Sequence, residues 1–471
     1  KMLELAAIGG KDSMSGTFMD MDVPPTLVAF AVDVIDVNDA VSQEFKKAGD
    51  VVIEVVLPRD KYEMPCFDIL KKNYKKINEI IKKGKVKASY TVKEGGIAEA
   101  VSKMCFGNSF SVDLKDMTGE EIFSPDYGSI ILEMDEKEDL DKLFGNVKYK
   151  VIGKVKEGDS FMDEAEKAWE EPLEKIFKTK TEPIDKDMIS SVFESKNKKS
   201  VSIKIAKPRV FIPVFPGTNC EYDSKRAFER AGAEVSISVF KNFRPDLINE
   251  SIDEFADNIN NSQIIMIPGG FSAGDEPDGS GKFIAAVFRN PKIKEAVMNL
   301  IKNRDGLMLG ICNGFQALIK LGLVPYGEIK DIDEDSPTLT NNKIGRHMSR
   351  MVMTKVVSNL SPWFNNVNVG DVFTIPISHG EGRFAAKSEI IRNLMLKGQV
   401  ATQYVDFNRN PSYDIKFNPN GSFCAVEGIT SPDGRILGKM GHSERMGTNV
   451  SKNVPGNKDQ KIFEAGVNYF R

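Results

Sequence analysis

The stretch "GLMLGICNGFQALIKLGLVP", residues 306–325, places a cysteine between two apolar runs. The run before Cys312 predicts a buried strand, and the periodicity after it predicts a helix over 313–321. Gly310 and Gly314 stand two residues to either side of the cysteine, and glycine relieves the crowding of a sharp strand-to-helix turn. The pattern is that of a nucleophile elbow, with sulfur in place of the serine oxygen.

The position of Cys312 favours a reactive thiolate over a buried structural cysteine. A helix N-terminus has unpaired N–H groups and a positive dipole, both of which stabilise a thiolate. In open α/β sheets, ligands bind beyond the carboxyl ends of the strands, where this residue is expected. The other cysteines lack that context and are interpreted as core or inert residues: Cys66, Cys105, Cys220 and Cys424.

Strands and helices alternate around the elbow from residue 207 onward. Predicted strands over 208–215 and 233–240 flank a predicted helix over 220–232, which indicates right-handed crossovers and a mostly parallel, flavodoxin-like sheet. Near the end of the chain, 422–441 contains the turn "SPDG" between two apolar runs. This segment predicts a hairpin.

Three parts are expected along the chain. Residues 1–157 mix strands and helices without strict alternation, which predicts an α+β domain. Residues 158–206 begin with a charged amphipathic helix and continue through polar residues, so we expect a helical linker. Residues 207–471 form the α/β domain. Because residue 1 is Lys and an apolar segment follows at once, we interpret the chain as the C-terminal piece of a longer polypeptide.

The composition narrows the possible partners. A net charge of −4 over 471 residues gives no general attraction to nucleic acid or to an anionic membrane. No apolar run approaches the roughly 18 residues of a membrane span. The five cysteines show no CxxC spacing and do not cluster with histidines, which argues against zinc and indicates reduced thiols in a cytoplasmic protein.

A thiolate nucleophile needs a base, and the chain has three histidines. "SHGEGRF" pairs His379 with Glu381, and "GHSERMG" pairs His442 with Glu444. Since residues i and i+2 at a strand end face the same side, either glutamate can accept the Nδ1 proton of its histidine and leave Nε2 facing the thiol. The spacing does not decide between the two pairs. His347 has no such partner and is interpreted as a surface residue.

A glycine pair in "IPGGFSAGD", residues 267–275, adds a third element to this site. The pair follows a predicted strand, and a Gly-Gly loop can turn backbone N–H groups toward a ligand. The amides of Gly270 and Asn313 are therefore candidates for holding a developing oxyanion.

These motifs together resemble a known family. "GICNGFQ" is similar to the elbow of class I glutamine amidotransferases. "PGTNCEYD", "PGGFSAGDE", "SHGEGRF" and the terminal His-x-Glu-Arg resemble, in that order, the glutaminase part of the phosphoribosylformylglycinamidine synthases, and "GGKDSMSGTF" and "KEGGIAEAV" resemble segments of their synthase part. The resemblance covers nearly the whole chain. It implies a class I amidotransferase domain preceded by the C-terminal part of an AIR-synthetase-like synthase domain.

The resemblance also implies a role for each residue of the site. Cys312 would attack the side-chain amide of glutamine, with His442 as the base and Glu444 orienting it. Gln316 would help to hold the glutamine. His379 would lie near the glutamine pocket or on the face toward the synthase.

Cofactors and partners are implied in the same way. The glutaminase step needs no cofactor, and its ammonia would pass to a synthase site that uses ATP and Mg²⁺ to convert formylglycinamide ribonucleotide to the amidine in purine synthesis. Most of that site would lie upstream of residue 1, in the missing N-terminal part of the same polypeptide. Within this chain, candidates for facing a nucleotide phosphate are Gly10, Lys11, Asp12 and Ser13; a glycine turn between two strands explains them equally well.

The sequence departs from the family at two places. Prolines commonly flank the terminal histidine of the family, whereas this chain has Gly441 and Ser443, which predicts a less rigid loop. An aspartate that often holds magnesium is replaced by Thr91, so a metal site in the N-terminal part is left open.

Two other interpretations fit the elbow. A cysteine hydrolase or peptidase of the DJ-1-like kind also places its cysteine at such a turn, although its base often follows closely and here no histidine occurs before His347. A non-catalytic scaffold that retains the elbow without its function is the other.

Overall fold

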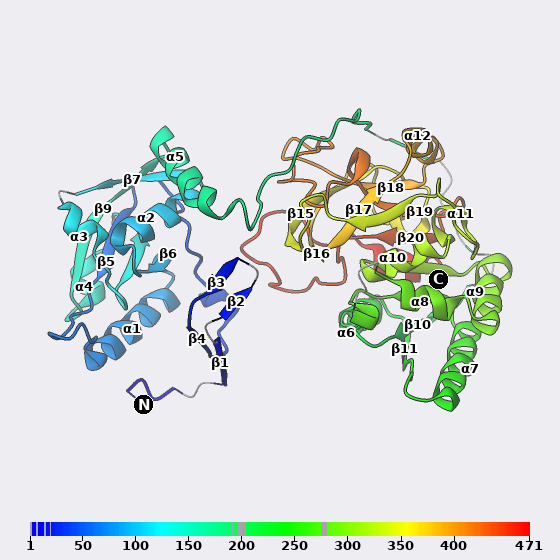
Figure 1. The fold of residues 1–471 in the computed structure, drawn as a ribbon, viewed down its shortest axis with the longest axis horizontal. Helices are drawn as coiled ribbons and strands as arrows, with labels where there is room; N and C mark the ends of the chain where they lie inside the picture. Colours follow the sequence, from blue (N-terminus) through cyan, green and yellow to red (C-terminus); the bar gives the residue numbers. More distant parts are fainter. Residues whose placement is uncertain are drawn as a thin grey trace. The chain divides into compact units, whose positions relative to one another are not determined.

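The computed structural model describes residues 2–5, 8–13, 16–18, 20–115, 117–190, 192–195, 201, 204–274 and 280–471 (Figure 1). The chain forms two compact units, 1–177 and 178–471. The division falls inside the segment 158–206 for which the sequence predicts a linker.

A nine-stranded sheet forms the centre of the second unit, in the order β11-β10-β12-β13-β20-β19-β18-β15-β16. Its strands are β10 (Arg209–Val214), β11 (Glu234–Val239), β12 (Ile264–Ile267), β13 (Leu307–Ile311), β15 (Met348–Val356), β16 (Val372–His379), β18 (Val400–Tyr404), β19 (Val426–Thr430) and β20 (Ile436–Lys439). The sheet is parallel from β11 to β20 and antiparallel from β20 to β16. The prediction of a mostly parallel sheet is therefore correct for only one half.

The change of direction follows from the connections. Parallel neighbours require a crossover, and the first half has crossover helices α6 (Glu221–Arg230), α7 (Pro245–Asn261), α8 (Lys282–Phe288) and α9 (Pro291–Asn303). In the second half, β19 and β20 form the predicted hairpin over 422–441, and β15 and β16 pair antiparallel along their length. The other α-helices and strands described in this unit are α10 (Asn313–Lys320), α11 (Leu323–Tyr326), β14 (Thr338–Asn341), β17 (Glu381–Ala385), α12 (Ser388–Leu396) and α13 (Ile462–Asn468).

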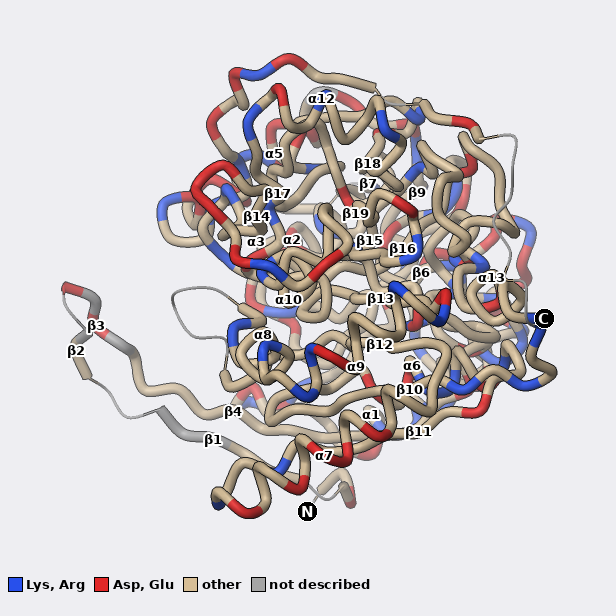
Figure 2. Tube along the Cα trace, turned by 90° about the vertical axis from the view of Figure 1, so that its right-hand side faces the viewer, with Lys and Arg blue, Asp and Glu red and all other residues tan. Residues whose placement is uncertain are grey.

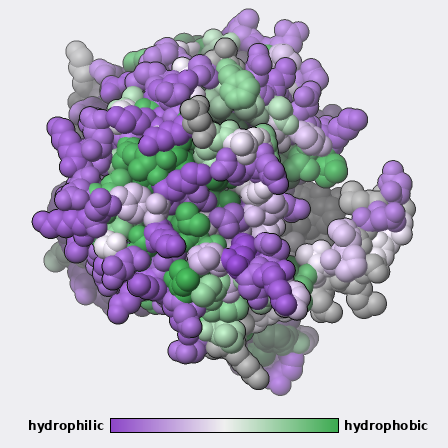
Figure 3. Space-filling model, turned by 90° about the vertical axis from the view of Figure 1, so that its left-hand side faces the viewer, coloured by the Kyte–Doolittle hydropathy of each residue, from purple (hydrophilic) through white to green (hydrophobic). Residues whose placement is uncertain are grey.

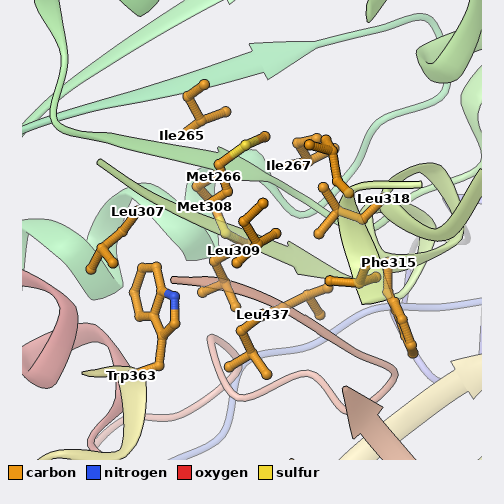
Figure 4. Packing of buried hydrophobic residues seen from close by; sticks show 14 of the residues in the cluster. Ile265, Met266, Ile267, Leu307, Met308, Leu309, Phe315, Leu318, Trp363 and Leu437 are labelled. Atoms are coloured by element: carbon orange, nitrogen blue, oxygen red, sulfur yellow. The ribbon is translucent and has the colours of Figure 1, made fainter. Parts of the chain in front are cut away.

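The core of this unit holds the elbow in place. Side chains of β12 and β13 interleave with those of α10 and β20 (Figure 4), and Leu309 and Phe315 are fully buried. A Cβ atom on Gly314 would lie 2.0 Å from the carbonyl oxygen of Ile267. Only glycine lets α10 approach β12 this closely, which fixes the helix N-terminus directly beyond the strand ends.

The first unit is built on a five-stranded antiparallel sheet in the order β6-β8-β5-β9-β7, in agreement with the predicted α+β class. Its strands are β5 (Val51–Val55), β6 (Val86–Thr91), β7 (Phe110–Leu114), β8 (Ile130–Met134) and β9 (Tyr149–Glu157). Its helices are α1 (Phe67–Lys82), α2 (Gly96–Phe106), α3 (Gly119–Phe123), α4 (Leu140–Phe144) and α5 (Ser160–Glu170). Short ribbons of β1 (Gly9–Ser13) with β4 (Thr26–Phe30), and of β2 (Gly16–Phe18) with β3 (Met21–Val23), precede the sheet.

The predicted linker is helical only at its start. Helical structure ends with the 3-10 turn Glu171–Leu173, and the described residues of 178–206 contain no helix. This part belongs to the second unit instead, where the Phe193 N–H donates to the carbonyl oxygen of Val357 and the Ile205 N–H to that of Phe470. The linker prediction therefore needs correction beyond Leu173.

The surface of the protein carries both signs of charge. Figure 2 shows basic and acidic residues interspersed over the second unit, and Figure 3 shows mainly hydrophilic side chains with smaller hydrophobic groups between them. Within the described part of the chain, no helix is both long enough and apolar enough to cross a membrane.

Candidate functional site

Cys312 sits at the sharp turn that the sequence predicts, between β13 and α10. Its backbone has φ 52° and ψ −105°, a conformation that costs free energy for any residue with a Cβ and that occurs at functional sites. The Cys312 N–H donates to the carbonyl oxygen of Lys439 (2.9 Å), and its Sγ lies 3.7 Å from the carbonyl oxygen of Ser378. The elbow thus contacts both β20 and β16.

Burial decides the protonation state of the elbow thiol. Only 5% of Cys312 is exposed, and burial raises the pKa of its thiol far above the ordinary value. Neighbouring Cys220 and Glu444 act in the same direction, while the Asn313 N–H acts against them. The predicted stabilisation of a thiolate by the helix N-terminus is outweighed, so the resting thiol is neutral and needs a base to activate it.

His442 and Glu444 form a buried pair next to the elbow. Nδ1 of His442 and Oε1 of Glu444 are 2.6 Å apart, and each residue is 2% exposed. Burial acts to raise the pKa of Glu444, but the charge and hydrogen bond of His442 leave that pKa below its ordinary value. Among the described residues, Nε2 of His442 has no hydrogen-bond partner although it is buried.

Backbone hydrogen bonds bring this pair to the same strands as the thiol. The His442 N–H donates to the carbonyl oxygen of Pro376 (2.8 Å) on β16, two residues from the Ser378 carbonyl beside the thiol. His442 also comes three residues after Lys439, the last residue of β20, whose carbonyl oxygen accepts the hydrogen bond of the Cys312 N–H. Residues that lie 130 positions apart in sequence are therefore held at one end of the sheet.

The second His-x-Glu motif does not form such a pair. His379 ends β16 and Glu381 begins β17, so the chain turns between them. Within the part of the chain that the structure describes, Nδ1 of His379 has no partner; Nε2 lies 3.2 Å from Nδ2 of Asn420. Glu381 instead accepts from the Ser280 N–H (2.7 Å). Burial lowers the pKa of His379 to about 3, so this imidazole is a poor proton acceptor.

The loop after β12 touches both halves of the site. A Cβ atom on Gly269 would lie 2.7 Å from Cε1 of His442. On the other side, the Ser272 N–H donates to Oδ1 of Asn313 (3.3 Å). Gly270 has φ +153°, and a Cβ there would meet the Gly217 carbonyl oxygen at 2.6 Å. The two predicted oxyanion amides thus belong to segments in contact, and their role stays a prediction.

Gln316 makes its contacts within the protein. It is 3% exposed, its Oε1 accepts from Nδ2 of Asn313 (2.9 Å), and its Nε2 donates to the carbonyl oxygen of Glu381. Both ends of the Gln316 amide are used in fixing Asn313 and β17. Its predicted contact with glutamine stays a prediction.

Cys220 lies beside the pair, although the sequence indicates an inert residue. Its Sγ is 3.8 Å from Nδ1 of His442 and accepts from Nη2 of Arg445 (3.1 Å). Burial raises the pKa of the Cys220 thiol to about 11. Because Cys220 and His442 are separated by 222 positions in the sequence, no local spacing could have revealed this contact.

Cys220, His442 and Glu444 also form the one group of potential metal ligands found among the described residues, with ligand atoms within 4.8 Å of one another. A cysteine and a histidine therefore do lie together in the folded chain, although they do not cluster in the sequence. The 2.6 Å between Nδ1 and Oε1 fits a shared proton, since ligand atoms about 2.0–2.1 Å from a tetrahedral zinc ion lie further apart than that. The arrangement fits a hydrogen-bonded dyad.

His347 is also closer to the site than the sequence suggests. Its Nε2 lies 3.0 Å from Oγ of Ser378, whose carbonyl oxygen faces the Cys312 thiol. Its ring centroid is 6.3 Å from that of Phe271, the residue after Gly270. His347 therefore belongs to the border of the elbow site.

The residues suggested for a nucleotide phosphate lie on an edge ribbon. Gly9–Ser13 is strand β1, paired with β4, so neither a loop nor a glycine turn is found there. Gly10 is described, whereas the side chains of Lys11, Asp12 and Ser13 lie outside the described residues. Thr91 is the last residue of β6.

The second unit matches a known protein family. The family described as CobB/CobQ-like glutamine amidotransferase domain matches residues 207–470. The phosphoribosylformylglycinamidine synthase subunit PurQ of Methanococcus maripaludis is 36% identical over 246 residues, which are 52% of this chain and 85% of that protein. The PurQ subunit of Treponema denticola is 33% identical over 286 residues, 56% of this chain and 99% of that protein. A chain in the structure of PurLQS from Thermotoga maritima is 28% identical, with a TM-score of 0.40, 56% of this chain and all of that one being covered.

Proposed function

Because this chain belongs to the family of CobB/CobQ-like glutamine amidotransferases, we propose that its second unit hydrolyses glutamine and provides ammonia for the synthesis of formylglycinamidine ribonucleotide. The observation that carries the proposal is the buried His442–Glu444 pair, whose free Nε2 belongs to the same end of the sheet as the elbow thiol. The names of the PurQ relatives support the choice of product.

The chemistry begins with the neutral thiol. Nε2 of His442 takes the Cys312 proton as Sγ attacks the side-chain carbonyl carbon of glutamine, and Glu444 stabilises the resulting imidazolium. The amides of Gly270 and Asn313 hold the oxyanion of the tetrahedral intermediate. The carbon–nitrogen bond then breaks, and ammonia leaves with the proton from His442.

A water molecule completes the cycle. His442 removes a proton from the water, whose oxygen attacks the thioester carbonyl, and the carbon–sulfur bond breaks to release glutamate and the thiol. In this scheme Gln316 orients Asn313, because its Oε1 accepts from Nδ2 of that residue. His379 remains neutral and packs behind the glutamine pocket.

The ammonia must be used before it reaches water, because ammonium has no lone pair with which to attack. We propose that it passes to a synthase site that uses ATP and Mg²⁺ to activate formylglycinamide ribonucleotide. Residues 1–177 would be part of that synthase within one longer polypeptide, and Gly10, Lys11, Asp12 and Ser13 are proposed to approach the nucleotide. The isolated chain is expected to form little amidine.

The experiment is covalent labelling by a glutamine-mimicking chloroketone, with the labelled peptide mapped by mass spectrometry. We expect label on Cys312, loss of glutamine hydrolysis in Cys312→Ala, and retention of hydrolysis in the control Cys66→Ala, whose thiol is exposed in the first unit. Reaction of Cys312 with a peptide aldehyde but not with the chloroketone would favour the DJ-1-like hydrolase. Hydrolysis by Cys312→Ala at the parent rate would refute the proposal.

A further inference from the structure

A fully buried ion pair lies beneath the loop that carries His442. Nζ of Lys439 and Oε1 of Glu427 are 3.2 Å apart, and both side chains are 0% exposed. Removing two charges from water is costly, and a buried pair is weak evidence for a gain in stability. A pair this deep therefore calls for another explanation.

The ammonium group of Lys439 contacts three buried oxygen atoms. Besides Glu427, it donates to the carbonyl oxygen of Gly441 (2.7 Å) and to Oγ of Ser443 (2.9 Å). These two residues flank His442. A protonated lysine has three N–H donors, so one side chain holds the loop on both sides of the imidazole.

Glu427 secures the same loop from the backbone side. Its Oε1 accepts from the Gly441 N–H (2.7 Å), and its Oε2 accepts from the Thr402 hydroxyl. The series of hydrogen bonds continues through Ser443, whose hydroxyl donates to Oε1 of Gln460 (2.5 Å). The loop thus has a buried polar partner at each residue next to His442. The glycine and serine predicted to loosen the loop are its points of attachment.

The backbone of Lys439 also contacts the backbone of Cys312. Its carbonyl oxygen accepts from the Cys312 N–H (2.9 Å), while its ammonium group holds the residues around His442. A single residue thereby connects the backbone at the thiol to the backbone at the imidazole.

From these contacts we propose that Lys439 and Glu427 are positioning residues that fix His442 relative to Cys312. The inference rests on the proposed function for its kinetic consequences, but the geometry itself can be tested without catalysis. A displacement of about 1 Å in a catalytic group can cost about 100-fold in rate, so small changes in these contacts have measurable effects.

The test compares two buried serines that each donate one hydrogen bond and accept another. Ser443→Ala removes the contacts with Lys439 and Gln460, whereas the control Ser358→Ala removes contacts with Gly398 and Leu360, away from the loop. We expect Ser443→Ala to lower kcat for glutamine hydrolysis by about 10-fold or more, with KM changed by less than about 3-fold, because the loop holds the base. Ser358→Ala should keep the parent kcat at a similar loss of thermal stability.

A second readout is independent of turnover. The Nδ1 proton shared by His442 and Glu444 should give a strongly downfield proton resonance, and Ser443→Ala should broaden or shift it while Ser358→Ala leaves it unchanged. The double variant Lys439→Met with Glu427→Gln removes both charges without leaving either one unpaired, and should behave like Ser443→Ala. If the parent protein does not hydrolyse glutamine, the proposed function fails and the resonance still decides the positioning role. Parent-like resonance and kcat in both variants would overturn the inference.

Discussion

Gly269 lies so close to His442 that adding a methyl group at position 269 should displace the imidazole ring. In Gly269→Ala, the new Cβ would lie 2.7 Å from Cε1 of His442 and 3.2 Å from Sγ of Cys220. Carbon atoms in contact lie about 3.5–4.0 Å apart, so the imidazole must move by roughly 1 Å. We expect kcat for glutamine hydrolysis to fall about 100-fold, while overpacking lowers the free energy of unfolding by only about 1–3 kcal/mol.

The assay is steady-state glutamine hydrolysis together with thermal unfolding. Gly447→Ala is the matched control, because Gly447 lies only three residues after Glu444. Its Cβ would meet nothing closer than Cγ2 of Val450 at 3.4 Å, which is an ordinary contact. A folded Gly269→Ala protein with kcat within about 3-fold of the parent would show that the position of the His442 ring does not control the rate.

Three further predictions follow from the same geometry. His442→Gln should lower glutamine hydrolysis by about 100-fold or more, whereas His379→Gln should keep most of it in the same assay; the opposite result would mean that His379 is the base. Burial lowers the pKa of His379 to about 3 from an ordinary 6.5. Between pH 3 and pH 6.5, His379 is therefore protonated in the unfolded chain and neutral in the folded protein. The free energy of unfolding should therefore fall by about 1 kcal/mol for each pH unit on acidification from pH 6.5 toward 3. Denaturant titrations at a series of pH values should show a weaker dependence of this free energy on pH for His379→Gln. Alkylation by iodoacetamide at pH 8 should label exposed Cys66 first, because burial raises the pKa values of Cys105 and Cys220 to about 12 and about 11; peptide mapping checks this order, and early labelling of Cys220 would contradict it.

The elbow and the crossovers could be predicted because their signals are local. Gly310, Cys312 and Gly314 lie within five consecutive residues, and the structure gives Cys312 the strained turn that this spacing indicates. The helix predicted over 313–321 is likewise α10, because its apolar periodicity needs no distant contact. By contrast, the linker predicted over 158–206 is helical only as far as Leu173, because later residues of that segment pair with distant backbone groups such as the Val357 and Phe470 carbonyls.

The surroundings of the base could not be predicted because they depend on contacts between distant segments. Two motifs with the same spacing have different outcomes: His442 and Glu444 share one loop, whereas His379 and Glu381 lie on different strands. Spacing alone does not distinguish the two motifs, whereas the family resemblance favours His442. Cys220 reaches the site only because the loop after β10 meets the loop after β12.

The loop around His442 shows why a missing motif residue is a weak guide to rigidity. Proline limits a backbone by fixing φ, but a hydrogen bond to a buried partner restrains it as well. Gly441 can donate its N–H to Glu427, which proline cannot, and its lack of a side chain leaves room for Ile375, whose Cδ1 would lie 2.1 Å from a Cβ at that position. Gly441 and Ser443, which predict a looser loop from the sequence, are therefore the residues that the buried Lys439–Glu427 pair binds. The absence of the prolines and the presence of the buried charges have the same explanation: both serve to hold this loop.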